Sequence, residues 1–294
     1  MKHVPTIVMG LVLAGTTLLP VCIQATVYVN ETFDAETIGS PPSDPAKLVS
    51  SQVTVAAGSG AIGADNVAWY NDAGGTVGAL EYNVGGSALG SLYVSFDLLN
   101  NAPNPTGTAA NPLQFAFGNW STLTSAQLNS SSKRSFNVQI NNIGASGTLK
   151  LQADTASGVT TTLQSTTYDM SALNTFKVWV NDNDTSTLFY TRPDNSSVAT
   201  LAANSAVVWL NDALIGTEAD SGFAMNNVTA GTGNTTGNNT LGRVGFVSTA
   251  ANLANFLIDN VYIADPVVVP EPSAFALAGF AGLLLVWARR RQAQ

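Results

Sequence analysis

The sequence predicts an all-β protein, an antiparallel β-sandwich, and three observations support this fold class. Apolar and polar residues alternate with a period of two in many short runs between Thr26 and Asp265, as in strands with one buried and one solvated face. Turn-forming residues separate these runs. No long stretch carries the apolar stripe of an amphipathic helix. Many short strands joined by polar loops predict two packed antiparallel sheets.

The clearest alternating runs follow one another along the whole central region. They are residues 26–33 (TVYVNETF), 91–98 (SLYVSFDL), 113–117 (LQFAF), 135–140 (SFNVQI), 148–152 (TLKLQ), 176–180 (FKVWV) and 256–263 (FLIDNVYI). Turn residues lie between them at 58–60, 74–75, 85–86, 141–142 and 181–184. Two polar stretches, 101–112 and 226–240, break the alternation and predict long surface loops.

The composition of the central region suits an exported β-protein and excludes several kinds of chemistry. Charged residues make up 10% of the chain, against about a quarter in average proteins. Residues 26–265 hold 7 of the 11 basic and 18 of the 19 acidic residues, a formal charge of −11. We therefore expect no nucleic-acid binding, because the region repels phosphate backbones. The single histidine, His3, and the single cysteine, Cys22, both precede this region, which leaves it no imidazole or thiol.

The first 25 residues have the layout of a secretory signal peptide. A short basic start is followed by an apolar stretch at 7–19 and then by Ala25, after which we expect cleavage. An uncleaved membrane anchor is the alternative, although about a dozen apolar residues are few for a span. We therefore predict that residues 1–25 direct export and that residues 26–265 form one domain outside the cytoplasm.

Residues 266–294 form a second targeting segment with three parts. These are the motif Val269, Pro270, Glu271, Pro272, Ser273, an uncharged stretch up to residue 288, and the cluster Arg289, Arg290, Arg291. The uncharged stretch predicts a transmembrane helix, and the arginines are expected to hold its far end in the cytoplasm. This ending resembles the PEP-CTERM sorting signal of Gram-negative bacteria. The resemblance implies cleavage by an exosortase, a transient stay in the inner membrane, and delivery to the cell surface or extracellular matrix, where such proteins accompany exopolysaccharide and biofilm systems.

The strand layout of the body resembles the concanavalin A/laminin-G jelly roll. The first strand ends in Glu31-Thr-Phe-Asp34, and the chain closes with 242–246 (GRVGF) and 256–261 (FLIDNV). The resemblance implies a jelly-roll β-sandwich whose first and last strands pair. It also implies a structural Ca²⁺ between these strands, with Glu31, Asp34 and Asp259 as candidate ligands, and carboxylate oxygens suit this hard cation. Asp182 and Asp184 are a second option for the ion, with a hairpin turn as the alternative.

No set of residues in the body predicts catalysis. A Ser–His–Asp triad requires a histidine, which the body lacks. Glycoside hydrolysis needs two carboxylates that flank the bond. The nearest candidates, Glu218 and Asp220, lack the third acid that jelly-roll glucanases carry on the same strand. We therefore expect a protein that is not an enzyme and requires no cofactor, with Ca²⁺ as the one ion left open.

Aromatic side chains are the remaining candidates for a binding site, because their flat apolar faces can stack on sugar rings. Trp120 is the best of these, since it follows a predicted strand end. The others are Trp69, Tyr70, Trp179 and Trp209, and packing in the core is the alternative for each of the five. We expect a surface or matrix protein that contacts extracellular polysaccharide or a neighbouring surface protein. A calcium-dependent, lectin-like module and a glycan-cleaving enzyme are the alternatives.

Overall fold

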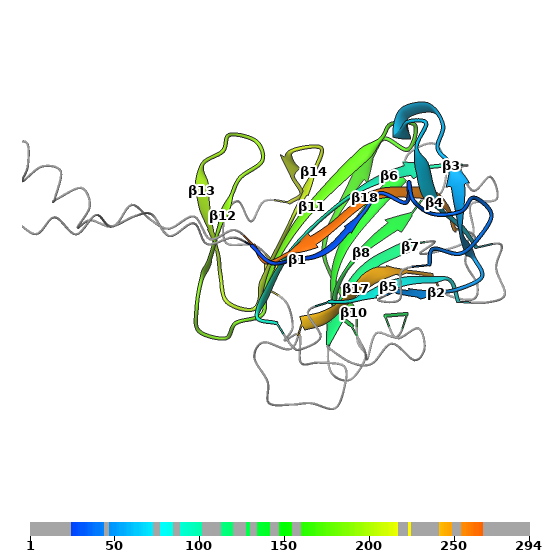
Figure 1. The fold of residues 1–294 in the computed structure, drawn as a ribbon. Coiled ribbons are helices and arrows are strands. Elements are labelled where there is room, and N and C mark those ends of the chain that lie inside the picture. Colours follow the sequence, from blue (N-terminus) through cyan, green and yellow to red (C-terminus); the bar gives the residue numbers. More distant parts are fainter. Residues whose placement is uncertain are drawn as a thin grey trace, which may run out of the picture.

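The computed structural model describes most of the central region. The described residues are 25–43, 47–72, 77–84, 89–101, 113–119, 128–129, 134–141, 147–154, 160–216, 223–224, 241–248 and 254–266. These residues form strands β1 to β18 and a single 3₁₀ turn, η1 (Gly60–Ile62). Figure 1 shows the strands gathered into two layers. The β-sandwich expected from the period-two alternation is confirmed, and a jelly roll is consistent with this arrangement.

The larger layer, which we name sheet A, has nine strands. Its hydrogen-bonded path runs through β15 (Ala213–Leu214), β14 (Ser205–Leu210), β11 (Asn174–Asn181), β6 (Ser91–Asn100), β18 (Ala254–Ala264), β4 (Asn66–Asp72) and β3 (Val53–Ala57). Two further strands, β1 (Val27–Glu31) and β16 (Phe223–Ala224), pair with β18 and β14 respectively. The antiparallel pairing of β1 with β18 confirms that the first and last strands are neighbours, as Figure 1 shows in blue and orange.

The second layer, sheet B, has seven strands. Its order is β10 (Thr160–Tyr168), β9 (Gly147–Asp154), β8 (Arg134–Asn141), β7 (Leu113–Asn119), β17 (Leu241–Val247), β5 (Ala79–Asn83) and β2 (Lys47–Val49). Every pairing in this sheet is antiparallel. Each of its strands therefore presents alternate side chains to the core and to the outside.

Alternating apolar side chains of both sheets form the core between the layers. Four phenylalanines lie at its centre, two from each sheet. The ring of Phe96 lies 4.6 Å from that of Phe115 and 4.8 Å from those of Phe176 and Phe246, measured between centroids. All four side chains are buried. Aromatic pairs at this spacing add about 0.5–1.5 kcal/mol each to the burial of their area, so this cluster is a main source of cohesion between the sheets.

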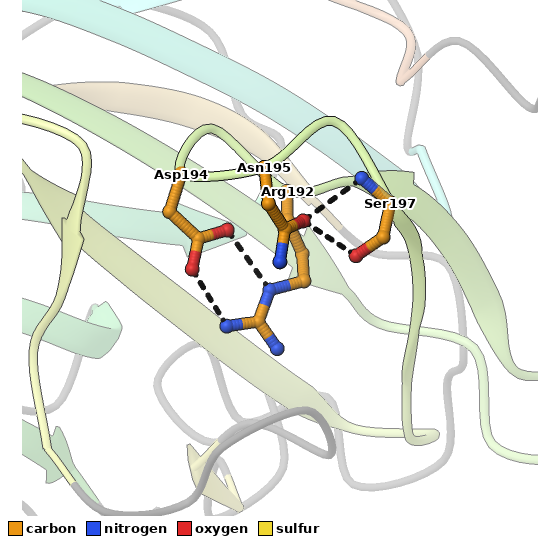
Figure 2. Close-up of polar contacts among 4 residues, drawn as sticks. All are labelled: Arg192, Asp194, Asn195 and Ser197. Atoms are coloured by element: carbon orange, nitrogen blue, oxygen red, sulfur yellow. Dashed lines mark hydrogen bonds and ion pairs between the residues drawn. The ribbon is translucent and has the colours of Figure 1, made fainter.

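A separate hairpin covers part of the outer face of sheet A. Its strands are β12 (Leu188–Thr191) and β13 (Val198–Leu201). Its apolar residues pack with strands β11 and β14 in a second cluster made of Trp179, Leu188, Tyr190, Ala199, Leu201, Val207 and Trp209. At the turn, Arg192 donates through Nη2 to Asp194 Oδ2 at 2.8 Å, and Asn195 Oδ1 accepts from the backbone N–H of Ser197 at 2.9 Å (Figure 2). The Arg192 guanidinium also lies 5.3 Å from the ring centroid of Trp209.

The two targeting segments fall almost wholly outside the described residues. Residues 1–24 and 267–294 are not described, so the signal peptide, the Pro-Glu-Pro motif, the transmembrane helix and the arginine cluster remain predictions from the sequence. Ala25, the expected cleavage point, is the first described residue. Within the described part of the chain, no helix has the length and apolar character needed to cross a bilayer.

Candidate functional site

The aromatic residues proposed for sugar stacking are mostly used for packing. Tyr70 lies in the main core, and Trp179 and Trp209 lie under the β12–β13 hairpin. Trp69 is half-buried on the outer face of sheet A, where its Nε1–H donates to Asn255 Oδ1 at 2.8 Å. Trp120 lies outside the described residues. Core packing, the alternative stated for these side chains, therefore holds for three of them.

Of the residues proposed as calcium ligands, Glu31 ends β1 and Asp259 lies on β18, whereas Asp34 lies in the turn after β1. Glu31 and Asp34 each accept a backbone hydrogen bond. Glu31 Oε1 accepts from the N–H of Phe33 at 2.9 Å, and Asp34 Oδ1 accepts from the N–H of Asn66 at 3.2 Å. In the portion of the chain that is described, no three acidic, histidine or cysteine side chains are grouped as a metal site. The calcium site therefore stays a prediction. The second option, Asp182 and Asp184, lies in the turn after β11, where Asp184 accepts from Asn204 at 2.8 Å.

Carboxylates do gather around Asp259, which is 4% exposed on β18. Burial raises the pKa of this side chain from 3.8 to about 6, and the negative charges of Asp34, Asp97 and Asp65 act in the same direction. The backbone N–H of Asn260 donates to Asp259 at 2.7 Å and opposes the rise in pKa. The resemblance that singled out Asp259 thus pointed to a buried carboxyl group whose ionisation is disfavoured.

A second polar group lies on the outer face of sheet B, and the sequence did not single it out as a site. We name it the polar wall. It consists of Glu81, Gln114, Arg134, Asn137, Gln139, Lys150, Gln152 and Arg243. It arises from strict alternation, because Phe136, Val138 and Ile140 on β8 enter the core and leave Asn137 and Gln139 on the opposite face.

The register of sheet B places the wall side chains in two rows across the strands. In the first row Gln114 is opposite Gln139, which is opposite Lys150 on β9. In the second row Asn137 is opposite Gln152, which is opposite Thr162 on β10. Side chains directly opposite each other have Cβ atoms about 4.5–5.5 Å apart, so each row is a continuous series of polar groups.

One end of the wall, near β5 and β17, is closed and holds a buried ion pair. Arg243 Nη1 donates to Glu81 Oε2 at 3.2 Å, and their side chains are 1% and 0% exposed. Glu81 Oε1 accepts from the N–H of Leu128 at 3.0 Å. Arg134 donates to the Gln114 carboxamide oxygen and to the Leu128 carbonyl. Burial lowers the pKa of Arg243, while the Glu81 charge acts in the opposite direction. This end is therefore an interior ion-pair network.

The other end of the wall opens to solvent at the β10 edge of the sheet. Thr162 and Ser165 are exposed and Lys150 is half-buried, whereas Gln152 and Gln139 are 7% and 3% exposed. The carbonyl oxygens of these two glutamines, both named Oε1, accept no hydrogen bond. Gln152 does donate from Nε2 to Thr162 Oγ1 at 3.2 Å. At this end, two carbonyl oxygens thus lack a described donor. They lie in the same rows as the hydroxyl groups of the β10 edge and the ammonium group of Lys150.

Sequence reasoning missed this site because each wall residue alone fits the solvated face of a strand. The strands themselves were predicted at 113–117, 135–140 and 148–152, and the structure confirms them as β7, β8 and β9. One signal was available: the outward positions of these strands hold Gln114, Asn137, Gln139 and Gln152. Amides at successive outward positions offer both donors and acceptors, which sets this face apart from an ordinary charged one.

Comparison with known proteins gives a likeness of fold and no family. No family model matches the chain, and no curated protein matches it. Similar solved structures include the globular domain of T. cruzi calreticulin, with 11% identity and a TM-score of 0.45 over 82% of this chain and 89% of that one. The potassium-bound carbohydrate recognition domain of Emp46p has 11% identity and a TM-score of 0.44 over 76% and 90%. The cellulose-induced protein Cip1 has 12% identity and a TM-score of 0.44 over 80% and 96%. At this level the likeness extends to the β-sandwich outline alone.

Proposed function

We propose that this chain is an exported, non-enzymatic protein of the bacterial cell surface or matrix that binds a glycan at the open end of the polar wall. One observation carries the binding proposal. The carbonyl oxygens of Gln139 and Gln152 are buried and accept no hydrogen bond within the described structure. Gln139 pairs with Lys150, which is half-buried, and Gln152 pairs with Thr162, which is exposed at the β10 edge.

The physical reason is the free energy of an unpaired acceptor. A buried carbonyl oxygen without a donor costs about 1–3 kcal/mol. An apolar residue at position 139 would avoid this cost and keep the fold. Sugar hydroxyl groups are donors of the right kind for these oxygens, and the hydroxyls of Thr162 and Ser165 can extend the same contacts to the exposed rim.

The wall is better suited to binding than to glycan cleavage. Glycoside hydrolysis uses two carboxylates, and Glu81 is the single carboxylate among the described wall side chains. Glu81 is engaged by Arg243 and by the N–H of Leu128. A carboxylate held in this way is not positioned to transfer a proton to a ligand at the opposite end of the wall.

The variant Gln139→Leu tests the binding proposal with the full chain in mild detergent. We expect the parent to bind members of a glycan array and the variant to lose at least about tenfold in affinity. Its stability should be unchanged or higher by up to about 1 kcal/mol, because the unpaired oxygen is removed. Gln164→Leu is the matched control, since Gln164 is half-buried on β10 opposite Leu151, which faces the core. Equal binding by parent and Gln139→Leu would contradict the proposed site.

Calcium dependence of this binding is the second candidate, motivated by the carboxylates near Asp259. Because Asp259 lies on sheet A and the polar wall on sheet B, the ion would act through the stability of the sandwich and not as a ligand of the sugar. Chelation of calcium should then abolish glycan binding, and added Ca²⁺ should restore it. The variant Asp259→Asn should reproduce the effect of chelation. Binding that is the same with and without a chelator would leave the polar wall as a calcium-independent site.

The targeting part of the proposal is supported by the two ends of the sequence. The signal-peptide layout of residues 1–25 and the resemblance of residues 266–294 to a PEP-CTERM signal both place the body outside the cytoplasm. Exosortase is the processing partner that this resemblance implies. An extracellular location also fits a glycan as the ligand.

A further inference from the structure

Lys150 differs from three other described basic side chains in having no acidic partner among the residues that the structure describes. Three described cations are in ion pairs: Lys177 with Asp212 at 2.7 Å, Arg192 with Asp194 at 2.8 Å, and Arg243 with Glu81 at 3.2 Å. Lys150 makes no ion pair with any residue that the structure describes. This is notable because the body carries 18 acidic residues and a formal charge of −11.

The position of Lys150 is also unlike that of an ordinary solvated lysine. It is half-buried on β9, opposite Gln139 on one side and Ser165 on the other. The unpaired carbonyl oxygen of Gln139 lies on the same row. A lysine whose only role is to keep the surface hydrated is not expected beside a buried amide whose carbonyl oxygen accepts no described hydrogen bond.

The charge of Lys150 suits an anionic ligand. The charged side chains Glu81, Arg134 and Arg243 belong to the closed end of the wall. The acidic residues of the domain repel an anionic ligand, but salt at physiological concentration screens this repulsion beyond about 8 Å. The charge-assisted contact of the ligand with Lys150 acts at hydrogen-bond distance.

We infer that the glycan site selects an acidic glycan, whose carboxylate or sulfate group contacts Lys150 Nζ while ring hydroxyls donate to Gln139 and Gln152. This inference rests on the proposed glycan binding and names the class of sugar. A neutral sugar would fill the two acceptors but would leave the ammonium group of Lys150 without a counter-charge. An acidic sugar offers both kinds of group on one ring.

Titration of the full chain with matched oligosaccharides tests the inference. The probes are an oligogalacturonate, its carboxyl-reduced neutral counterpart, and a sulfated oligosaccharide of the same length. We expect the parent to bind an anionic probe at least about tenfold more tightly than the neutral one. The carboxylate and sulfate probes show which anion the site prefers. In Lys150→Gln this preference should disappear, and Lys150→Arg should retain it.

One control variant and two sets of outcomes distinguish failure of this inference from failure of the glycan-binding proposal. Lys177→Gln removes a lysine on the outer face of sheet A and should leave every affinity unchanged. Equal affinity of the parent for anionic and neutral probes, or an anionic preference that survives Lys150→Gln, would overturn the inference while glycan binding stands. A parent that binds none of the probes and no member of the array would overturn the glycan-binding proposal as well.

Discussion

Gln139 and Arg243 are both buried on the same face of sheet B. They differ in their partners. Arg243 is paired with Glu81, and breaking such a buried pair by removing one partner costs about 3–5 kcal/mol. Gln139 keeps a buried acceptor that no described donor reaches. The fold therefore explains the first residue, whereas the proposed glycan would supply the donor that the second residue lacks. This contrast is why the site is placed at the β10 end of the wall.

The ionisation of Asp259 makes the stability of the fold depend on pH. Its pKa is about 6 in the folded chain and 3.8 as an ordinary carboxyl, so the folded state binds more protons between these values. Stability from this group is therefore present below about pH 4 and decreases as pH rises to 6. Asp259→Asn should be more stable than the parent at pH 7 by about 1–2 kcal/mol, a value reduced for screening by water.

Urea unfolding of both proteins at several pH values measures this effect. The difference in the free energy of unfolding should be near zero at pH 4 and grow until about pH 6. Asparagine at this position can still accept the hydrogen bond from the N–H of Asn260, which isolates the charge. A difference that is the same at pH 4 and pH 7 would show that Asp259 titrates normally.

Strands with a clear alternation were predictable as elements, and polar edge strands were not. The prediction at 91–98 is confirmed by β6, where Leu92, Val94, Phe96 and Leu98 are buried and the residues between them are more exposed. β10 has the sequence TTTLQSTTY and was missed. It lies at the edge of sheet B and pairs with β9 alone. An edge strand buries few side chains, so its sequence lacks the apolar repeat on which the prediction depends.

The β12–β13 hairpin should depend on Arg192 for its attachment to sheet A. The guanidinium links Asp194 in the turn to the ring of Trp209 on β14. Arg192→Ala removes a partly exposed ion pair worth up to about 1 kcal/mol and a cation–π contact worth about 0.5–2 kcal/mol. We expect a loss of about 1–2 kcal/mol that is confined mainly to the hairpin.

Hydrogen exchange resolved by residue distinguishes this local effect from a global one. Amides of β12 and β13 should exchange faster in Arg192→Ala, while those of β6 and β11 stay protected. Lys177→Ala is the control, because it removes an ion pair on the same outer face that does not involve the hairpin. Uniform acceleration across sheet A would contradict a local role for Arg192.

At the scale of the whole molecule, the two sheets are joined by polar groups as well as by the aromatic core. Ser248, which follows β17 of sheet B, donates to Asp72 at the end of β4 in sheet A. The same hydroxyl accepts from the N–H of Gly78 at 3.0 Å. Tyr70 lies beside this group, and burial raises the pKa of its phenol well above its usual value. This buried connection fixes one end of the sandwich.

Delivery of the molecule should depend on the Pro-Glu-Pro motif near its end. Replacement of Pro270, Glu271 and Pro272 by alanine should prevent processing and leave the chain in the inner membrane of its native host. Cell fractionation, with mass spectrometry of the C-terminal peptide, measures the outcome. Pro266→Ala is the matched control outside the motif. Normal delivery of the triple variant, with the apolar segment still removed, would contradict the sorting prediction.

The sequence by itself determined the period of the strands, the turns between them and the acidic body, and it predicts export signals at its ends. These properties depend on neighbours along the chain, because side-chain alternation is a local consequence of an extended backbone. Tertiary structure alone decided which polar faces became buried. It aligned Gln114, Gln139 and Lys150 from three strands and left the carbonyl oxygens of Gln139 and Gln152 without donors among the described residues. Register and burial arise from pairing between distant segments, so the outward amides in the sequence could not by themselves specify the site.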